Sequence, residues 1–231
     1  MKYKKIIKAI FIERPNRFIA YCQIAGEVHK VHVKNTGRCK ELLVPGVIVY
    51  LEESDNPNRK TKYSLIAVEK GNLLINMDSQ VPNQVVEEAL RTGKIKLPGI
   101  TEPFTWIKRE KTYGQSRFDF YIETLKEKIF IEVKGVTLEE EGIVRFPDAP
   151  TQRGVKHIEE LVSATKEGYK CYVLFVVQMA KARYFTPHEA KHPEFAKALV
   201  SAAQNGVGIL AYTCEVAPDT LVIDQPLEVK L

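Results

Sequence analysis

Residues 116–135 read SRFDFYIETLKEKIFIEVKG, two runs of strand-forming residues joined by a four-residue connector. The second run is apolar except for Glu132 and Lys134, and the first run carries Arg117 and Asp119. Side chains alternate between the two faces of a strand, so Glu132 and Lys134 are predicted to share one face, as are Arg117 and Asp119. Charges at positions where a buried strand favours Val or Ile point to chemistry rather than to packing.

The short connector predicts a β-hairpin in which Glu123 pairs with Lys128. Counting inward from that pair places Asp119 opposite Glu132, and the residue two positions before Asp119 opposite Lys134. A register shifted by one residue would set a polar face against an apolar face, which the pattern disfavours. The opposite face of the first strand is expected to hold three apolar side chains, Phe118, Phe120 and Ile122.

Two carboxylates that face each other across a pair of strands repel, at a cost of some tenths to about 1 kcal/mol. A divalent cation removes that repulsion, and Mg²⁺ is typically held by one or two carboxylates together with waters and phosphate oxygens. We therefore predict a Mg²⁺ or Mn²⁺ site formed by Asp119 and Glu132, with the Val133 carbonyl as a further ligand. Lys134 would orient a water or stabilise charge on a phosphate, as in metal-assisted phosphodiester hydrolysis. The alternative is two ion pairs on an exposed face, Asp119–Arg117 and Glu132–Lys134.

The first 80 residues have the pattern of a small β-barrel. Six short runs rich in Ile, Val, Phe and Tyr alternate with turn residues, while residues 37–46 form either a short helix or a loop. Residues 1–80 contain 14 Lys and Arg against 8 Asp and Glu, whereas residues 81–231 contain 20 against 21. A basic barrel of this kind is a platform for nucleic acid, or else only supports the rest of the chain.

Residues 81–231 predict a mixed-sheet α/β domain. A helix is expected over 83–92, with Asn83 as its N-cap, followed by three strand-like runs. An amphipathic helix then precedes a fully apolar strand, YKCYVLFVVQM, at 169–179, and one more helix and two strands complete the chain. This order of elements with D…E-x-K resembles the PD-(D/E)xK nuclease superfamily. The resemblance implies that Asp119 and Glu132 bind metal and that Lys134 assists catalysis.

That superfamily often has an acidic residue on its first helix, a role that Glu87 or Glu88 would fill here. Glu87 also precedes Arg91 by four residues, so a surface ion pair is the alternative. Longer motifs in matching order resemble the sugar fermentation stimulation protein family over nearly the whole chain: HVKNTGRCKELL, PNQVVEEAL, SRFDFYI, IEVKGVTL and FPDAPTQRGVKHIEEL. This resemblance implies an OB-like barrel over about 1–80, a nuclease-like domain over about 81–231, and DNA as the partner.

Several polar side chains are predicted to contact DNA phosphates, in the loop NTGRCK and around the nuclease-like site. They are Asn35, Thr36, Arg38, Lys40, Arg117, Arg153 and His157. For the loop the alternative is a purely structural turn, and for the helix residues a solvated flank. The start of the helix near Pro150 also offers free N–H groups to a phosphate.

Three functions follow from these observations. The first is a DNA-binding nuclease that depends on Mg²⁺ or Mn²⁺. The second is a non-catalytic DNA-binding regulator of sugar-metabolism genes with a silent nuclease-like site. The third is an assembly protein whose acidic cluster is only structural.

The remaining features indicate a cytoplasmic protein. Its four cysteines are widely spaced, which is typical of reduced thiols, and its most apolar run is too short to span a bilayer. HEAKH at 188–192 fits a zinc-protease pattern, but the prolines that flank it disfavour the continuous helix that pattern needs. Nothing in the sequence indicates a homo-oligomer.

Overall fold

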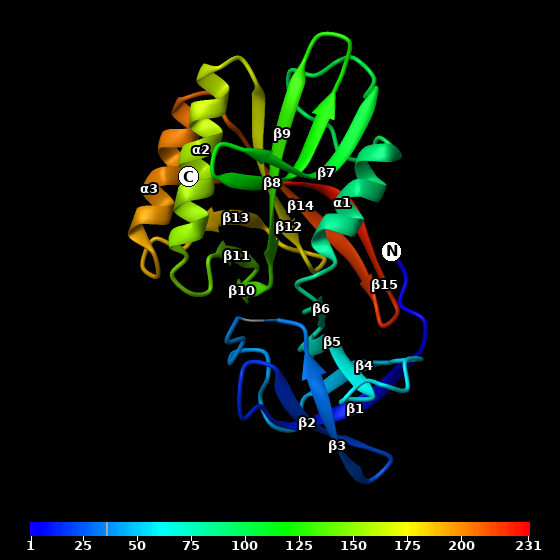
Figure 1. Ribbon diagram of the computed structural model, residues 1–231. Coiled ribbons are helices and arrows are strands. Elements are labelled where there is room, and N and C mark those ends of the chain that lie inside the picture. The colour runs from blue at the N-terminus through cyan, green and yellow to red at the C-terminus, as the bar shows by residue number, and fades with distance from the viewer. Residues whose placement is uncertain (36) are drawn as a thin grey trace.

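The computed structural model describes residues 1–35 and 37–231, and its first part is a closed β-barrel (Figure 1). The strand order is β3-β2-β1-β4-β5-β6, and a parallel pairing of β3 with β5 closes the barrel. The strands are β1 (Ile6–Glu13), β2 (Ile19–Ile24), β3 (Glu27–Val33), β4 (Ile48–Glu53), β5 (Tyr63–Lys70) and β6 (Leu73–Asn76). The small barrel predicted from the sequence is therefore confirmed, and residues 37–46 form turns rather than a helix.

A mixed α/β domain follows, as expected. Its main sheet has the order β15-β14-β12-β9-β8-β7, in which β12 runs parallel to both of its neighbours and the other pairs are antiparallel. These strands are β7 (Trp106–Tyr113), β8 (Ser116–Glu123), β9 (Lys128–Val136), β12 (Lys170–Val177), β14 (Gly208–Ala217) and β15 (Thr220–Leu227). A second sheet of three short strands, not predicted, is formed by β10 (Leu138–Glu140), β11 (Ile143–Phe146) and β13 (Tyr184–Pro187).

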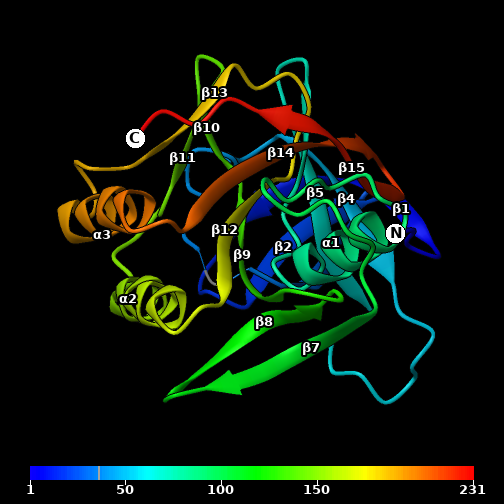
Figure 2. The ribbon, with the colours of Figure 1, turned by 90° about the horizontal axis from the view of Figure 1, so that it is seen from above.

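Helices cover both faces of the main sheet (Figure 2). They are α1 (Pro82–Arg91), α2 (Gln152–Lys166) and α3 (Pro193–Gln204). The apolar side of α2, with Ile158 and Leu161, packs in one buried cluster with α3, while Val85 and Val86 of α1 lie in a separate cluster on the other face. Burying such a side chain contributes about 1.5–3 kcal/mol, so the apolar stripes of the helices fix their placement on the sheet.

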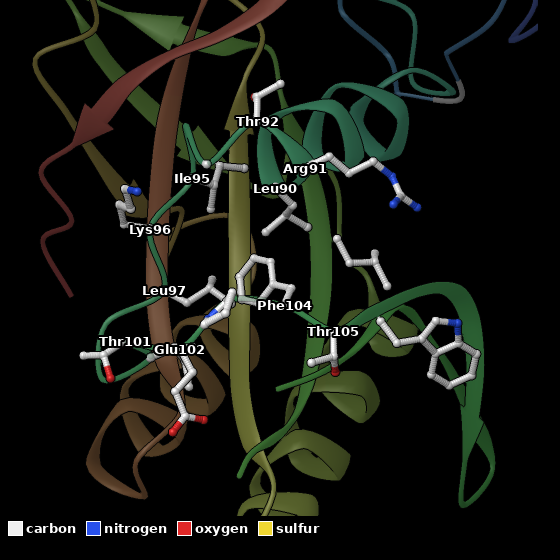
Figure 3. Close-up of a pocket in the computed structure, with 15 residues that line it drawn as sticks. Leu90, Arg91, Thr92, Ile95, Lys96, Leu97, Thr101, Glu102, Phe104 and Thr105 are labelled. Atoms are coloured by element: carbon white, nitrogen blue, oxygen red, sulfur yellow. The ribbon is translucent and has the colours of Figure 1, made fainter. Parts of the chain in front are cut away.

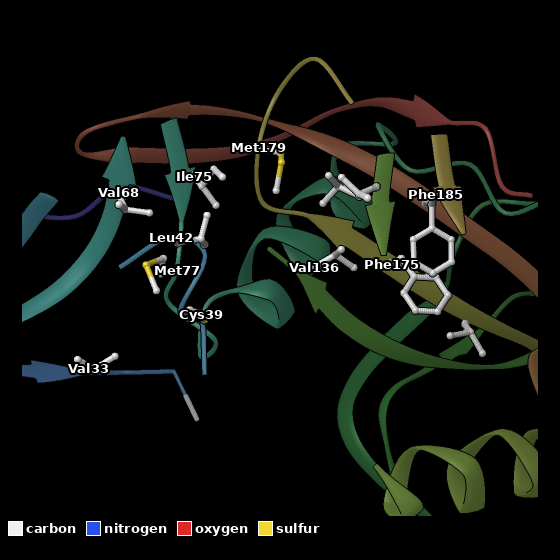
Figure 4. Packing of buried hydrophobic residues seen from close by; sticks show 14 of the residues in the cluster. Val33, Cys39, Leu42, Val68, Ile75, Met77, Val136, Phe175, Met179 and Phe185 are labelled. Carbon is white, nitrogen blue, oxygen red and sulfur yellow. The ribbon is translucent and has the colours of Figure 1, made fainter. Parts of the chain in front are cut away.

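One continuous core joins the barrel to the α/β domain. Val33 and Ile75 of the barrel belong to the same buried cluster as Val136 and Met179 of the second domain (Figure 4). The chain after β9 and β12 thus packs directly against the barrel wall, which makes the two domains a single packed unit.

A polar seam runs beside this core. The Asn76 N–H donates to the Gln178 carbonyl at 2.9 Å, and Gln178 Nε2 donates to Asn76 Oδ1 at 3.0 Å. Both side chains are almost fully buried, so each polar group needs the other. An ion pair between Lys70 Nζ of the barrel and Glu139 Oε2 at 2.6 Å adds a second polar link.

Three further expectations can be compared with the fold. All four cysteines are free and buried, as predicted. Residues 188–192 lie in turns before α3, so the HEAKH segment lacks the helix of a zinc-protease site. Within the described part of the chain, no helix is long and apolar enough to cross a membrane.

Candidate active site

Asp119 lies where the pairing of β8 with β9 stops. The predicted pair Glu123↔Lys128 is present, and the pairing continues to Phe120↔Ile131 but no further. At the next position Asp119 Oδ2 accepts a hydrogen bond from the Val133 N–H at 2.8 Å. The predicted register is therefore confirmed as far as Phe120↔Ile131, and at the next position the Asp119 carboxylate takes the place of a backbone contact with Glu132.

Glu132 is the buried centre of the site, with an exposed fraction of only 3%. Its Oε1 atom lies 2.6 Å from Lys134 Nζ and 2.5 Å from His157 Nδ1. Glu132 and Lys134 thus share a face of β9 as alternation predicts, and α2 adds an imidazole to them. Their contact is also the ion pair that the sequence left open, although here it is buried rather than exposed.

The two carboxylates differ in their electrostatics. Burial raises the pKa of Asp119, and the neighbouring Glu132 carboxylate raises it further, against the hydrogen bonds from Val133 and Asn83. Burial also acts to raise the pKa of Glu132, but the hydrogen bonds from His157 and Lys134 outweigh it and the pKa is lowered. The effect of Glu132 on the pKa of Asp119 indicates that the two carboxylates repel when both are ionised.

A single hard cation fits the donor set. Glu132 Oε2 is buried and has no hydrogen-bond partner, which is costly for a carboxylate oxygen unless something else binds it. Among the described residues, no group of three or more His, Cys, Asp and Glu side chains is arranged to hold a metal ion. Two carboxylates with waters and substrate oxygens suit Mg²⁺ or Mn²⁺, whereas a closed zinc cage needs more side-chain ligands.

The first helix reaches the site through an amide rather than an acid. Asn83 Nδ2 donates to Asp119 Oδ1 at 2.7 Å, so Asn83 is not the predicted N-cap, and the helix has no side-chain cap there. Glu87 instead pairs with Arg91 at 2.7 Å, and Glu88 binds the N-terminal ammonium group at 2.6 Å. Both acids are thus satisfied away from Asp119, and neither is the expected first-helix ligand.

Two expectations about β8 also need correction. Arg117 is exposed and pairs with Glu110 at 3.5 Å, so it does not lie opposite Lys134. Phe118 packs with Phe130 and α2, while Phe120 lies in the cluster on the α1 side. The alternation of faces fails between them at Asp119, whose neighbour on β7 would be Glu110, a residue with a φ of 58°.

Arg153 and His157 are one turn apart on α2, but they have different environments. His157 is 5% exposed and hydrogen-bonded to Glu132, so its expected role as a phosphate contact is wrong. Arg153 is exposed, and its Nε donates to His157 Nε2 at 3.3 Å, which leaves the rest of its guanidinium facing outward. Thr151 caps the helix, its hydroxyl accepting from the Gly154 N–H at 3.1 Å.

The loop after β3 is organised by Arg14. Its guanidinium donates to the carbonyls of Asn35, Gly37 and Arg38 at 2.6–2.8 Å. The Asn35 side chain accepts from the Gly37 N–H at 2.8 Å and donates to the Met77 carbonyl at 2.9 Å, so it shapes the loop with one of its two amide hydrogens.

The two cations of this loop, Arg38 and Lys40, are both exposed at the surface of the barrel. Their contacts with phosphates stay predictions. Thr36 lies outside the described residues.

A small polar cavity of about 170 Å³ connects this loop with β9, the strand that carries Glu132. It is lined from the barrel side by Asn35 and Gly37, and from the second domain by Gly135, Asp148 and Gln178. Gly135 follows Lys134 directly on β9, so the loop that carries Arg38 and the candidate active site border one recess.

A larger cavity, of about 720 Å³, lies elsewhere (Figure 3). The end of α1 and the segment that leads to β7 form its walls, and Figure 3 shows Leu90, Leu97 and Phe104 among its lining side chains. Neither Asp119 nor Glu132 lines it. We place the chemistry at the carboxylates, because volume alone supplies no reactive group.

Comparisons with known proteins agree with both parts of the fold. A family model described as the SfsA N-terminal OB domain matches residues 12–77. A second, described as the sugar fermentation stimulation protein RE domain, matches residues 80–220. The barrel therefore has the expected OB fold.

Similar proteins cover the whole chain. Homologues of the sugar fermentation stimulation protein from Ruminiclostridium cellulolyticum and Clostridium beijerinckii are 55% and 54% identical, each over 100% of both chains. A solved structure, SfsA of Pyrococcus furiosus in complex with Ca²⁺, matches with a TM-score of 0.88 and 29% identity, covering 100% of this chain and 98% of that one.

Proposed function

We propose that this chain, which belongs to the sugar fermentation stimulation protein family, binds DNA and hydrolyses phosphodiester bonds with the help of a divalent cation. The observation that carries the proposal is the buried, unpartnered Oε2 of Glu132 beside the Asp119 carboxylate. The Pyrococcus relative is described in complex with Ca²⁺, a hard cation with the same preference for oxygen ligands. Mg²⁺ or Mn²⁺ is the proposed working ion here.

Asp119 and Glu132 would hold the ion, with the Val133 carbonyl as a further ligand. When bound, such an ion lowers the pKa of a water and offsets charge on the phosphate. Lys134 is 16% exposed and sits at the open side of Glu132. Its ammonium group is placed to bind a non-bridging phosphate oxygen and stabilise the charge that develops during hydrolysis.

The DNA path is proposed to start on the barrel. Residues 1–80 carry the excess of positive charge, and the loop held by Arg14 presents Arg38 and Lys40. Phe18, in the turn after β1, is 56% exposed, and an exposed aromatic on an OB barrel is a stacking surface for a base. Arg153, exposed on α2 and bonded to the His157 imidazole, is proposed to take the path on to the carboxylates.

A direct test is a nuclease assay on single- and double-stranded DNA with Mg²⁺, Mn²⁺ or EDTA, comparing the wild type with Glu132→Ala. Cleavage that requires the metal and disappears in the variant supports the proposal. Wild-type protein that binds DNA well but cleaves no form of it with either ion contradicts the enzymatic part.

The second candidate is a DNA-binding regulator with a silent site. One observation favours it: both first-helix acids, Glu87 and Glu88, form ion pairs elsewhere and so do not add to Asp119 and Glu132 as ligands. The same assay separates the candidates, because a regulator keeps its DNA affinity when the carboxylates are removed and shows no turnover.

A further inference from the structure

We propose that His157 is a positioning residue that fixes Glu132 so that Oε2, and not Oε1, faces the metal. This inference rests on the proposed function and assigns separate roles to the two carboxylate oxygens of Glu132. Glu132 Oε1 accepts from two donors, whereas Oε2 is buried with none. A carboxylate held this way has one oxygen committed to the protein and one left for a cation.

The direction of the His157 bond follows from its second neighbour. Arg153 Nε, which can only donate, lies 3.3 Å from His157 Nε2. Nε2 must therefore accept, and the proton that bonds Glu132 is carried by Nδ1. Arg153 thus selects the tautomer, as hydrogen-bond partners of metal ligands do, and the order Arg153, His157, Glu132 runs from the surface to the ion.

Packing holds the imidazole in place. His157 lies on the buried side of α2, and its ring meets Phe118 edge to face, with the ring centres 6.2 Å apart. Phe118 lies on this side of β8 only because the alternation fails at Asp119. The same backbone irregularity therefore places one carboxylate and supports the group that orients the other.

The two donors to Glu132 Oε1, Lys134 and His157, differ in how exposed they are. Lys134 belongs to the partly exposed face, with 16% of its side chain exposed, while only 7% of the His157 side chain is exposed. A phosphate that enters the site competes with Glu132 for the Lys134 ammonium. His157 keeps Oε1 in place when Lys134 turns to the substrate, so the ligand geometry persists through the reaction.

The test is a calorimetric titration of the metal-free full-length chain with Ca²⁺ alone. The variants are His157→Leu, which fills the site without a donor, and His157→Asn, whose amide nitrogen stands where Nδ1 stands. His157→Leu is expected to bind Ca²⁺ about 10–100-fold more weakly, the usual loss when a hydrogen-bond partner of a metal ligand is removed. His157→Asn should recover affinity to within a few-fold of the wild type.

His192→Asn is the matched control, because His192 is also buried but contacts Thr151 and Gln152 rather than Glu132. It should bind Ca²⁺ like the wild type. Equal affinity of His157→Leu and the wild type, or no recovery in His157→Asn, overturns the inference alone. A wild type that binds no Ca²⁺ overturns the proposed metal site and this inference with it.

Discussion

Asp119 Oδ2 accepts the Val133 N–H at 2.8 Å, at the position where the backbone pairing of β8 with β9 ends. The Asp119 side chain is held in position by a hydrogen bond to the backbone of β9, in the place where the strands would otherwise pair. The carboxylate is therefore preorganised for a ligand, and its hydrogen bonds decide which substitution the fold tolerates.

Asp119→Asn is expected to fold and to lose its response to metal. The oxygen of the new amide can still accept from the Val133 N–H. The new amide nitrogen can donate to Asn83 if the Asn83 amide rotates to present its oxygen. Because burial and Glu132 raise the pKa of Asp119, its charge destabilises the metal-free fold at neutral pH. Thermal unfolding in EDTA should show a midpoint equal to or above that of the wild type. The rise in midpoint that Ca²⁺ gives the wild type should be absent, and a variant that retains it contradicts the ligand role.

Lys134→Ala is expected to separate binding from catalysis. Lysine is not a metal ligand, so Ca²⁺ affinity should remain within a few-fold of the wild type. Cleavage should fall by about 10²–10³, the loss typical of removing one preorganised charge-stabilising group. Lys128→Ala, an exposed lysine at the other end of β9, is the control. Equal losses of rate in both variants would show that Lys134 has no special role.

Arg38→Ala is expected to weaken DNA binding through phosphate contacts. Each phosphate contact contributes about 0.9 to the slope of log affinity against log salt on double-stranded DNA, so the slope should fall by about one. Asn35→Ala should act differently, because it loosens the loop that Arg14 organises instead of removing a charge. Fluorescence anisotropy over a series of salt concentrations measures both. An unchanged slope in Arg38→Ala would place the DNA elsewhere.

The overall fold was predictable because its signals are local. Apolar residues that alternate along short runs predicted the barrel strands, and the apolar stripe around Ile158 and Leu161 predicted α2. The strands β10, β11 and β13 were not predicted because each has only three or four residues. A pattern that short carries no period to recognise.

The site was predictable only in part, for a related reason. Alternation along one strand put Glu132 beside Lys134, and this contact is observed. The bonds from His157 and Asn83 depend on how α2 and α1 pack on the sheet, which sequence spacing does not contain. Asn83 shows the difference directly. Its local sequence favours a role as helix N-cap, whereas in the folded chain its amide donates to Asp119.

Glu139→Gln should make the free energy of unfolding less dependent on pH in the acid range. Burial acts to raise the pKa of Glu139, but the bonds from Lys70 and from the Gly142 N–H outweigh it and the pKa is lowered. Such a group adds stability above the pKa of an unfolded glutamate, about 4.3, and that stability is lost as pH falls through the lower folded value. Urea unfolding at several pH values should show the wild type more stable at pH 7, and the difference shrinking below about pH 4. A constant difference would mean that the ionised pair contributes nothing.

Gly135→Ala tests whether the recess between the barrel and β9 is closely packed. An added Cβ would lie 2.6 Å from Gln178 Oε1 and 3.0 Å from Pro82 Cγ, so its neighbours must move. Overpacking of this kind costs about 1–3 kcal/mol in the free energy of unfolding. Because Gly135 follows Lys134, the same shift should lower cleavage more than Ca²⁺ affinity.

Gln178→Ala provides the second arm of a double-mutant cycle, since it removes the atom that the new methyl group meets while also breaking the bonds to Asn76. Substitutions that share a contact are not additive. The double variant should therefore be more stable than the sum of the two single losses predicts, by at least about 0.5 kcal/mol in chemical unfolding. Additive losses would show that the backbone of β9 moves to relieve the clash. In that case, the contact with Gln178 would not explain why a glycine is needed at position 135.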